Sequence, residues 1–243
     1  MNMMLGWSRR AATMVACVLF SGCGADPTGP GVSGPDRSGV GSGSLRIEAS
    51  VSADPAAGER ATSAGELDTH FEIDVRDAAG LDVTGAVVIV DSALGPITLS
   101  EGGCGRRYCG RQLGHAPTYE LSVTRGADYV DDVRLSGPGF HAVITPAPGS
   151  TVDATRPLSV AWSASGRADS ATVETRETSV EVAGDTGSYT VPAGVLRTRA
   201  DRPEDERIRV RRRARLALTG ALPGSELAIS VRNGVEFLTA AAP

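Results

Sequence analysis

The stretch Leu45-Arg46-Ile47-Glu48-Ala49-Ser50-Val51 alternates apolar and polar side chains with a period of two. The same alternation returns in Phe71-Glu72-Ile73-Asp74-Val75-Arg76. Successive side chains of a β-strand point to opposite faces of its sheet, so this pattern predicts half-buried antiparallel strands. No longer window carries the apolar stripe of a helix, and we therefore expect an all-β fold.

Short runs of the same kind continue to the C-terminus, with turn residues between them at the spacing typical of a β-sandwich. They lie at residues 86–90, 119–123, 130–135, 140–144, 157–163, 171–175, 179–183, 188–191, 207–218, 226–231 and 235–238. A linker-like turn, Thr145-Pro146-Ala147-Pro148-Gly149-Ser150, divides these runs. The sequence thus predicts two tandem antiparallel β-sandwich modules, residues 45–145 and 146–243.

The composition allows a packed core and excludes some function classes. Of the 243 residues, 41% are hydrophobic and 22% are charged. The net charge of −5 argues against a nucleic-acid partner. All 24 basic residues are arginine, because the chain contains no lysine. No phosphate-binding loop or pair of catalytic carboxylates stands out, so no cofactor is expected.

The N-terminus has the pattern of a secretory signal. Arg9 and Arg10 precede an uncharged apolar run, residues 11–20, which is too short to span about 30 Å of hydrocarbon as a helix. The run ends in Leu19-Phe20-Ser21-Gly22-Cys23, which resembles the lipobox of bacterial lipoproteins, although that family usually has Leu where Phe20 stands.

The resemblance implies that residues 1–22 are a signal peptide and that Cys23 carries the lipid, a palmitate-type anchor in the membrane. Because Gly24 rather than Asp follows the cysteine, family analogy favours the outer membrane or cell surface. The alternative is an ordinary signal peptide in which Cys23 is incidental. Residues 24–44 contain seven Gly, three Pro and four Ser, so we expect residues 23–44 to form a disordered tether.

Two stretches resemble known sandwich families. Val75-Arg76-Asp77-Ala78-Ala79-Gly80, with residues 83–88 after it, is similar to a turn and strand of immunoglobulin-like and carboxypeptidase-regulatory-like modules. Pro157-Leu158-Ser159-Val160-Ala161-Trp162-Ser163 resembles an early strand of a fibronectin type III domain. The resemblance implies a sandwich and brings no active site with it.

Cys104 and Cys109 lie in a glycine-rich loop and predict a disulfide in an exported protein. Such a bond would hold Arg106, Arg107 and Tyr108 on a rigid knuckle. Arg and Tyr are enriched at binding hot spots, so this knuckle is a candidate recognition site. The cysteine spacing matches no zinc pattern, and no metal is expected.

The densest charge lies between Glu206 and Leu216. As a strand, this stretch places five arginines on one face: Arg207, Arg209, Arg211, Arg213 and Arg215. Apolar residues share the other face, and only Arg212 breaks the pattern, which suggests a bulge or an edge. One interpretation is a polyanion site for lipopolysaccharide phosphates or an acidic polysaccharide. The preferred one is a solvated face balanced by carboxylates of neighbouring strands: Glu174, Glu177 and Glu181.

Asp185-Thr186-Gly187-Ser188 matches the aspartic-protease signature. That chemistry needs two aspartates sharing a proton, and the chain holds one copy. We therefore interpret residues 184–187 as a hairpin turn between the strands at 179–183 and 188–191. An acidic group near the predicted module junction, Asp128, Asp131 and Asp132, lacks the spacing of a calcium site.

The function expected from these patterns is that of a non-catalytic cell-envelope lipoprotein, not an enzyme. Its modules would bind, or attach structurally to, a protein or glycan partner of the envelope. Two alternatives stay open: polyanion or polysaccharide binding through the Arg-rich strand, and a small secreted enzyme that uses Asp185.

Overall fold

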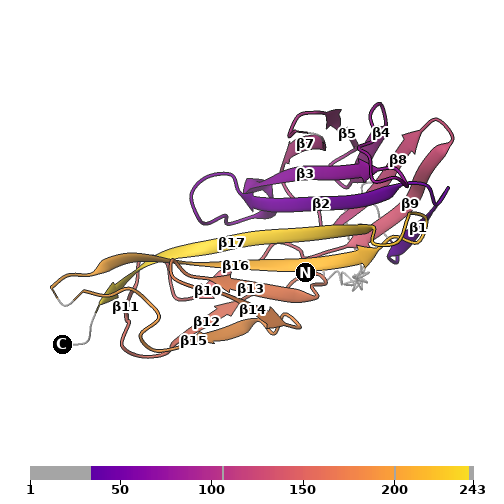
Figure 1. Ribbon diagram of the computed structural model, residues 1–243. Coiled ribbons are helices and arrows are strands. Elements are labelled where there is room, and N and C mark those ends of the chain that lie inside the picture. The colour runs from indigo at the N-terminus through magenta and orange to yellow at the C-terminus, as the bar shows by residue number, and fades with distance from the viewer. Residues whose placement is uncertain (1–33, 106, 200, 241–243) are drawn as a thin grey trace, which may run out of the picture.

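The computed structural model describes residues 34–105, 107–199 and 201–240. These residues form 17 strands and one short 3₁₀ helix, η1 (Ala64–Glu66) (Figure 1). The strands are β1 (Arg37–Gly41), β2 (Arg46–Pro55), β3 (Leu67–Arg76), β4 (Val87–Ser92), β5 (Ile97–Thr98), β6 (Ser100–Glu101), β7 (Tyr108–Leu113), β8 (Thr118–Arg125), β9 (Asp128–Ser136), β10 (Val143–Thr145), β11 (Thr151–Asp153), β12 (Leu158–Trp162), β13 (Ser170–Glu174), β14 (Ser179–Ala183), β15 (Ser188–Val191), β16 (Glu204–Ala217) and β17 (Glu226–Ala240). The predicted all-β fold is confirmed.

The strands form three sheets. The largest has nine strands in the order β14-β13-β16-β17-β2-β3-β7-β6, with β11 also paired to β17. A five-stranded sheet has the order β1-β9-β8-β4-β5, and a three-stranded sheet the order β10-β12-β15. Most pairs are antiparallel as expected, but β17 runs parallel to both β2 and β11.

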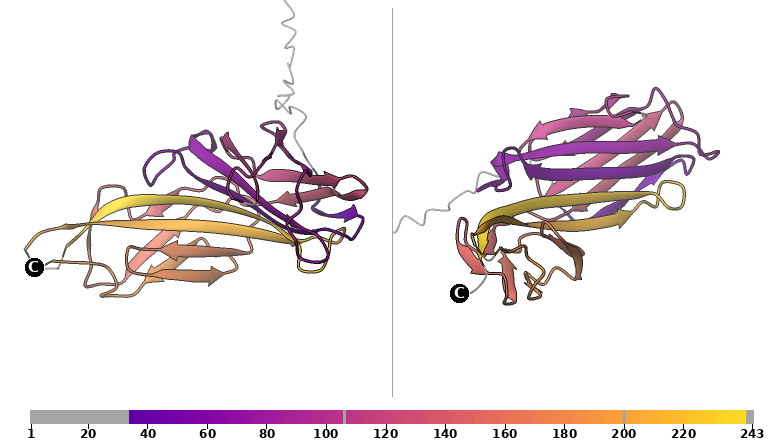
Figure 2. Two further views of the ribbon diagram at one scale, coloured as in Figure 1. Left: turned by 45° about the horizontal axis from the view of Figure 1, so that its top comes forward. Right: turned by 60° about the vertical axis from the view of Figure 1, so that its left-hand side comes forward.

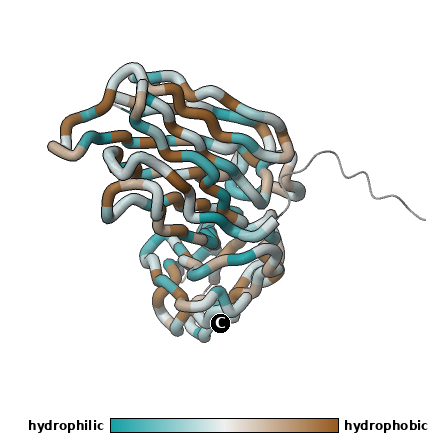
Figure 3. Tube along the Cα trace, turned by 90° about the vertical axis from the view of Figure 1, so that its right-hand side faces the viewer, coloured by the Kyte–Doolittle hydropathy of each residue, from teal (hydrophilic) through white to brown (hydrophobic). Residues whose placement is uncertain are grey.

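The two smaller sheets cover different halves of one face of the nine-stranded sheet, so the chain folds as two sandwiches in series (Figure 2). The first core lies under the five-stranded sheet and includes Ile47, Phe71 and Leu121. The second lies under the three-stranded sheet and includes Trp162 and Val173. The alternation of apolar and polar residues along neighbouring strands, visible in Figure 3, is what gives each sheet one buried face.

One long hairpin, β16 and β17, belongs to both sandwiches. Its register runs unbroken from Glu204 opposite Thr239 to Ala217 opposite Glu226. Its inward side chains near the turn, at residues 214, 218, 227 and 229, lie in the first core. Those at residues 208, 210, 235 and 237 lie in the second core. The structure thus differs from the predicted division into residues 45–145 and 146–243, because the end of the chain completes the first sandwich.

The prediction that residues 23–44 form a disordered tether is wrong for the second half of this segment. There β1 pairs antiparallel with β9, and the Ser38 and Thr219 hydroxyls lie 2.9 Å apart. Gly41 serves close approach rather than flexibility, because a Cβ there would overlap the Gly220 carbonyl oxygen. The predicted lipidation site, Cys23, and the predicted signal peptide lie outside the described residues.

Candidate functional site

Arg212 does not break the pattern of its strand. It follows Ile208 and Val210 on the inward face of β16 and is fully buried between the two cores. The pairing of β16 with β17 continues through this position without a bulge. The sequence-based expectation of a bulge or edge is therefore wrong, and Arg212 is an internal residue of the sheet.

The partner of Arg212 is Asp185, the aspartate of the protease-like motif. Arg212 Nη2 lies 2.6 Å from Asp185 Oδ2, and Nε donates to the same oxygen at 2.8 Å. The guanidinium also donates to the carbonyl oxygens of Ser165 at 2.6 Å and Gly166 at 3.2 Å. The other carboxylate oxygen of Asp185 accepts a hydrogen bond from Trp162 Nε1 at 2.9 Å. Asp185 is thus held by structural contacts on both oxygens.

Residues 184–187 are a connection between sheets rather than a hairpin turn. Strand β14 pairs with β13 in the nine-stranded sheet, whereas β15 pairs with β12 in the three-stranded sheet. Asp185 has a φ of 41°, a left-handed conformation in which Asp is one of the few tolerated residues. The turn crosses from one layer to the other, which brings its aspartate inward to Arg212.

Two further buried polar side chains lie beside this pair. The Nε2 atom of His141 lies 3.0 Å from the carbonyl oxygen of Val210, and burial lowers the pKa of His141 to about 4. The amide of Asn233 donates to the carbonyl oxygens of Ala61 at 3.0 Å and His141 at 2.7 Å. We call Arg212, Asp185, His141 and Asn233 the polar layer. It separates the two apolar cores along the inward face of the shared hairpin.

The knuckle forms its predicted disulfide between Cys104 and Cys109, whose Cα atoms lie 6.1 Å apart. Tyr108, however, is 1% exposed, so its assignment to an exposed recognition tip is wrong. Its hydroxyl donates to the Val83 carbonyl at 2.9 Å and accepts from the Ala86 amide at 2.9 Å. The reason is the strand period: Tyr108 opens β7 on its inward face. Arg106 lies outside the described residues.

The five predicted arginines do share the outer face of β16. Their strongest partner is one that the sequence does not indicate: Glu59, which accepts from Arg209 Nη2 at 2.5 Å and from Arg207 Nη1 at 3.1 Å. The hydrogen bond from Arg209 lowers the pKa of the Glu59 carboxyl against the opposing effect of burial. Of the three predicted carboxylates, Glu174 lies opposite Arg209 in the register, and Glu177 pairs elsewhere, with Arg197.

The arginines nearer the hairpin turn have fewer carboxylates close to their guanidinium groups. Arg213 lies 3.7 Å from Glu226, and burial followed by the charge of Arg215 lowers the pKa of Arg213. The Nε atom of Arg211 is buried and has no hydrogen-bond partner. Within the part of the chain that the structure describes, no carboxylate lies within 4.0 Å of the guanidinium of Arg211 or Arg215. Positive charge therefore gathers on the half of the strand that lies over the first core.

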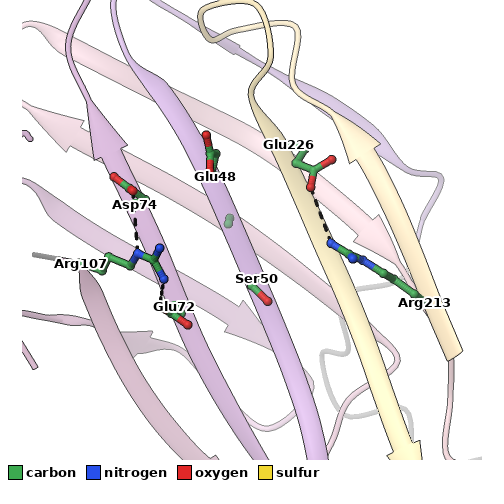
Figure 4. A pocket seen from close by; sticks show the side chains of 8 residues that line it. Glu48, Ser50, Glu72, Asp74, Arg107, Arg213 and Glu226 are labelled. Atoms are coloured by element: carbon green, nitrogen blue, oxygen red, sulfur yellow. Dashed lines mark hydrogen bonds and ion pairs between the residues drawn. The ribbon is translucent and has the colours of Figure 1, made fainter. Parts of the chain in front are cut away.

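The knuckle and the Arg-rich strand face one shallow depression of about 170 Å³ on the outer face (Figure 4). Arg107 pairs there with Glu72 and lies 3.8 Å from Asp74, while Arg213 approaches Glu226 from the other side. Strand β2 passes between them with Glu48 and Ser50. Two features that lie far apart in the sequence thus belong to one surface, which we call the outer face.

Other candidate sites do not assemble. Asp128 accepts a hydrogen bond from the Ser44 hydroxyl at 2.6 Å, and Asp132 pairs with Arg37 at 2.9 Å. Among the residues described, no three His, Cys, Asp or Glu side chains gather as metal ligands. No helix in the same ranges is long and apolar enough to cross a membrane.

No family model matches the sequence, and no curated protein matches it either. Among solved structures, the fibronectin(III)-like modules of Clostridium thermocellum CbhA are similar to this chain at 14% sequence identity. The match covers 74% of this chain and 92% of that chain, with a TM-score of 0.25. The sandwich assignment accordingly rests on the strand pairing and cores described above.

Proposed function

We propose that this chain is a non-catalytic lipoprotein of the cell envelope, anchored through Cys23, whose β-sandwiches serve binding or structural attachment. The observation that carries the proposal is the outer face of the nine-stranded sheet. Both smaller sheets pack on the other side, so β16, β17, β2 and β3 lie side by side with their outer face covered by neither of these sheets (Figure 1). Such an uninterrupted surface suits a macromolecular partner better than a small substrate.

The side chains of the outer face favour polar recognition. Along β2 they are Arg46, Glu48, Ser50, Ser52 and Asp54, and along β17 they include Ser230, opposite Ser52. Small hydroxyl residues at the centre allow close approach of a partner, and charged residues of both signs surround them. A protein or a glycan that offers hydrogen-bonding groups fits this chemistry.

The anchor sets how far this surface stands from the membrane. Only 13 residues, Gly24 to Asp36, separate Cys23 from β1. Fully extended, they span at most about 45 Å. A lipid on Cys23 would thus keep the sandwiches close to the bilayer, as attachment to an envelope partner requires.

Metabolic labelling with a clickable fatty acid tests the anchor. We expect the full-length protein to take up the label and Cys23→Ala to lose it, while Cys104→Ser keeps it as the matched cysteine control. Label that persists in Cys23→Ala would refute the assignment of the lipid to this residue.

Capture from envelope extracts tests the role of the outer face. The full-length protein is compared with a variant carrying Ser52→Arg and Ser230→Arg, which adds bulk and charge at the centre of the face without touching either core. We expect the wild type to capture a protein or glycan that the variant does not. No capture, or equal capture by both, counts against the proposal.

A second candidate function is polyanion binding, which the positive charge of Arg211, Arg213 and Arg215 favours. Of these three, within the described residues, only Arg213 has a carboxylate within 4.0 Å, that of Glu226 at 3.7 Å. Replacing these three by Ser should abolish retention on heparin and on vesicles containing lipopolysaccharide. Replacing Arg207 and Arg209 by Ser is the comparison, because both of these arginines pair with the carboxylate of Glu59. Retention should fall steeply with salt. Equal retention of the two variants on heparin and on the vesicles would exclude polyanion binding by Arg211, Arg213 and Arg215.

A further inference from the structure

The nine-stranded sheet ends at β14, which has a neighbouring strand on one side only, β13 (Figure 1). A sheet edge presents unpaired backbone amides and carbonyls, and native proteins usually shorten or cover such an edge. Strands β5 and β6 have two residues each, β10 has three and β15 has four, while Thr219 donates to the carbonyls of Ser38 and Gly39 in β1. With five residues, β14 is therefore the longest edge that no other described segment covers.

Two hydrogen bonds fix which backbone groups of β14 are free. The Thr178 carbonyl accepts from the Thr175 amide at 2.8 Å, and the Gly184 amide donates to the Asp169 carbonyl at 3.2 Å. Bonded and non-bonded positions alternate along an antiparallel pair, so every second residue between these two bonds is bonded to β13. The residues in between direct their backbone N–H and C=O away from the sheet: Ser179, Glu181 and Ala183. Within the described residues, none of these backbone groups has a hydrogen-bond partner.

The inward side chains of β14 lie at the margin of the second core. Val180 and Val182 are half-buried, and Val182 packs against this core together with the half-buried Tyr189 of β15. Strands β14 and β15 are end strands of their sheets and are joined by the short turn at residues 184–187, so both lie on the same side of the second sandwich. This margin is apolar and incompletely covered. A strand added to β14 would cover it with every second side chain.

The outward side chain at the centre of β14 is Glu181. It is exposed, and no arginine or histidine of the described residues lies within 4.0 Å of its carboxylate. An antiparallel neighbour that overlaps the whole strand places its own central residue opposite Glu181. If that neighbour were β14 of a second copy, two Glu181 carboxylates would meet, which is unfavourable. A basic residue at this position would form an ion pair instead.

We propose that the edge of β14 binds an extended segment of a partner polypeptide, which joins the nine-stranded sheet as an antiparallel strand. The segment carries a basic residue opposite Glu181, with an apolar residue on each side of it that packs beside Val180 or Val182. Backbone hydrogen bonds supply affinity, and the alternating side chains supply specificity. The proposal does not rest on the function proposed for the outer face, because it uses none of the strands β2, β3, β16 and β17.

NMR titration of the full-length protein with capped peptides tests the site. The peptide TVRVT has the proposed pattern, and TVEVT reverses its central charge. We expect saturable binding of TVRVT, with slower hydrogen exchange of the Ser179, Glu181 and Ala183 amides. TVEVT should bind about tenfold or more weakly, because its glutamate meets Glu181.

N-methylated peptides test the backbone pairing without changing the protein. Methylation of the arginine amide of TVRVT removes a donor that faces β14 and should weaken binding by about tenfold. Methylation of a valine amide, which faces away from β14 in the antiparallel arrangement, is the matched control and should leave the affinity unchanged.

Two substitutions of Glu181 separate charge from backbone. Glu181→Arg should exchange the preference, so that TVEVT binds more tightly than TVRVT. Glu181→Pro removes an outward N–H, at a position where edge strands tolerate proline, and should weaken binding of TVRVT by about tenfold or more. Glu236→Arg changes an exposed glutamate of β17 and should bind both peptides like the wild type. The N-methylated peptides keep the test decisive if Glu181→Pro fails to fold.

Several results would overturn the proposal: no saturation with TVRVT, equal affinity for TVRVT and TVEVT, or slower exchange confined to amides outside residues 179–183. Slower exchange of the same amides at rising protein concentration, without peptide, would assign the edge to a second copy and would also overturn it. The variant with Ser52→Arg and Ser230→Arg should bind TVRVT like the wild type. Failure of the function proposed for the outer face is therefore distinguishable from failure of this site.

Discussion

The guanidinium of Arg212 lies 2.6 Å from the carboxylate of Asp185, and both groups are buried between the two cores. Each looks anomalous in the sequence, Arg212 as a charge on an apolar face and Asp185 as half of a protease motif. In the folded chain the Asp185 carboxylate balances the buried charge of Arg212, and Arg212 is the structural partner of the aspartate in the protease-like motif. The pair connects the shared hairpin to the turn that joins β14 and β15, and so ties two sheets together.

Removing one member of this pair should be strongly destabilising. Arg212→Met leaves the Asp185 carboxylate buried without its partner, and we expect a loss of about 3–5 kcal/mol. Asp185→Asn should cost a similar amount, although Asn tolerates the left-handed turn. The double variant should lose less than the sum of the two. Urea denaturation checks all three, and strictly additive losses would show that the pair is not energetically coupled.

Acidification should weaken the fold through His141. Burial lowers its pKa from 6.5 to about 4 in the folded chain, whereas an unfolded chain takes up the proton near pH 6.5. Stability that is present above pH 6.5 is therefore lost as the pH falls toward 4, by roughly 3 kcal/mol from this residue. Burial also lowers the pKa of His115, which acts in the same direction.

Denaturation of His141→Gln as a function of pH isolates this contribution. The variant should lose less stability than the wild type between pH 6.5 and pH 4. A His141→Gln slope equal to that of the wild type would show that His141 takes up its proton without cost in the fold.

The shared hairpin predicts one unfolding transition for both sandwiches. Ile229→Ala in the first core and Phe237→Ala in the second should each destabilise by about 2–5 kcal/mol and shift the same transition. Scanning calorimetry checks this through the ratio of calorimetric to van't Hoff enthalpy, which should be near one. Two transitions, each sensitive to one variant only, would mean that the cores unfold separately.

Replacing Tyr108 in the knuckle should lower the stability of the protein more than replacing Arg107. Tyr108→Phe leaves the Val83 carbonyl and the Ala86 amide without their partner and should cost about 1–3 kcal/mol. Arg107→Ala removes exposed ion pairs and should cost less than about 1 kcal/mol. Thermal denaturation of both variants compares them, and a larger loss in Arg107→Ala would reverse this assignment.

The sequence predicted strands and faces well because a period of two specifies which side of a strand is buried. Residues 45–51 and 71–76 carry that signal, and β2 and β3 contain them in full apart from Leu45. Periodicity does not specify the neighbouring strand, so it could not reveal that β17 pairs with β2. Nor could periodicity predict that Glu59 pairs with Arg209 or that Asp185 pairs with Arg212, since these contacts join chain segments that meet only in the folded protein.

One signal was present and misinterpreted. Arg212 falls in phase with Ile208, Val210 and Ala214, and phase alone places it inside. The charge of Arg212 does not exclude burial, because a buried charge that has a partner is tolerated. Gly41 shows in the same way that a glycine in such a segment can allow two backbones to approach closely.

The parallel pairing of β17 with β2 has a consequence for the order of synthesis. Strand β2 is synthesised before its neighbour β17, which is the last strand of the described chain. The first sandwich accordingly stays open along one edge of β2 until residues 226–231 have been synthesised. Closure of this sandwich therefore depends on a contact between strands more than 170 residues apart in the sequence. Contacts of such large sequence separation are typical of slow folding and leave a strand edge exposed in the meantime.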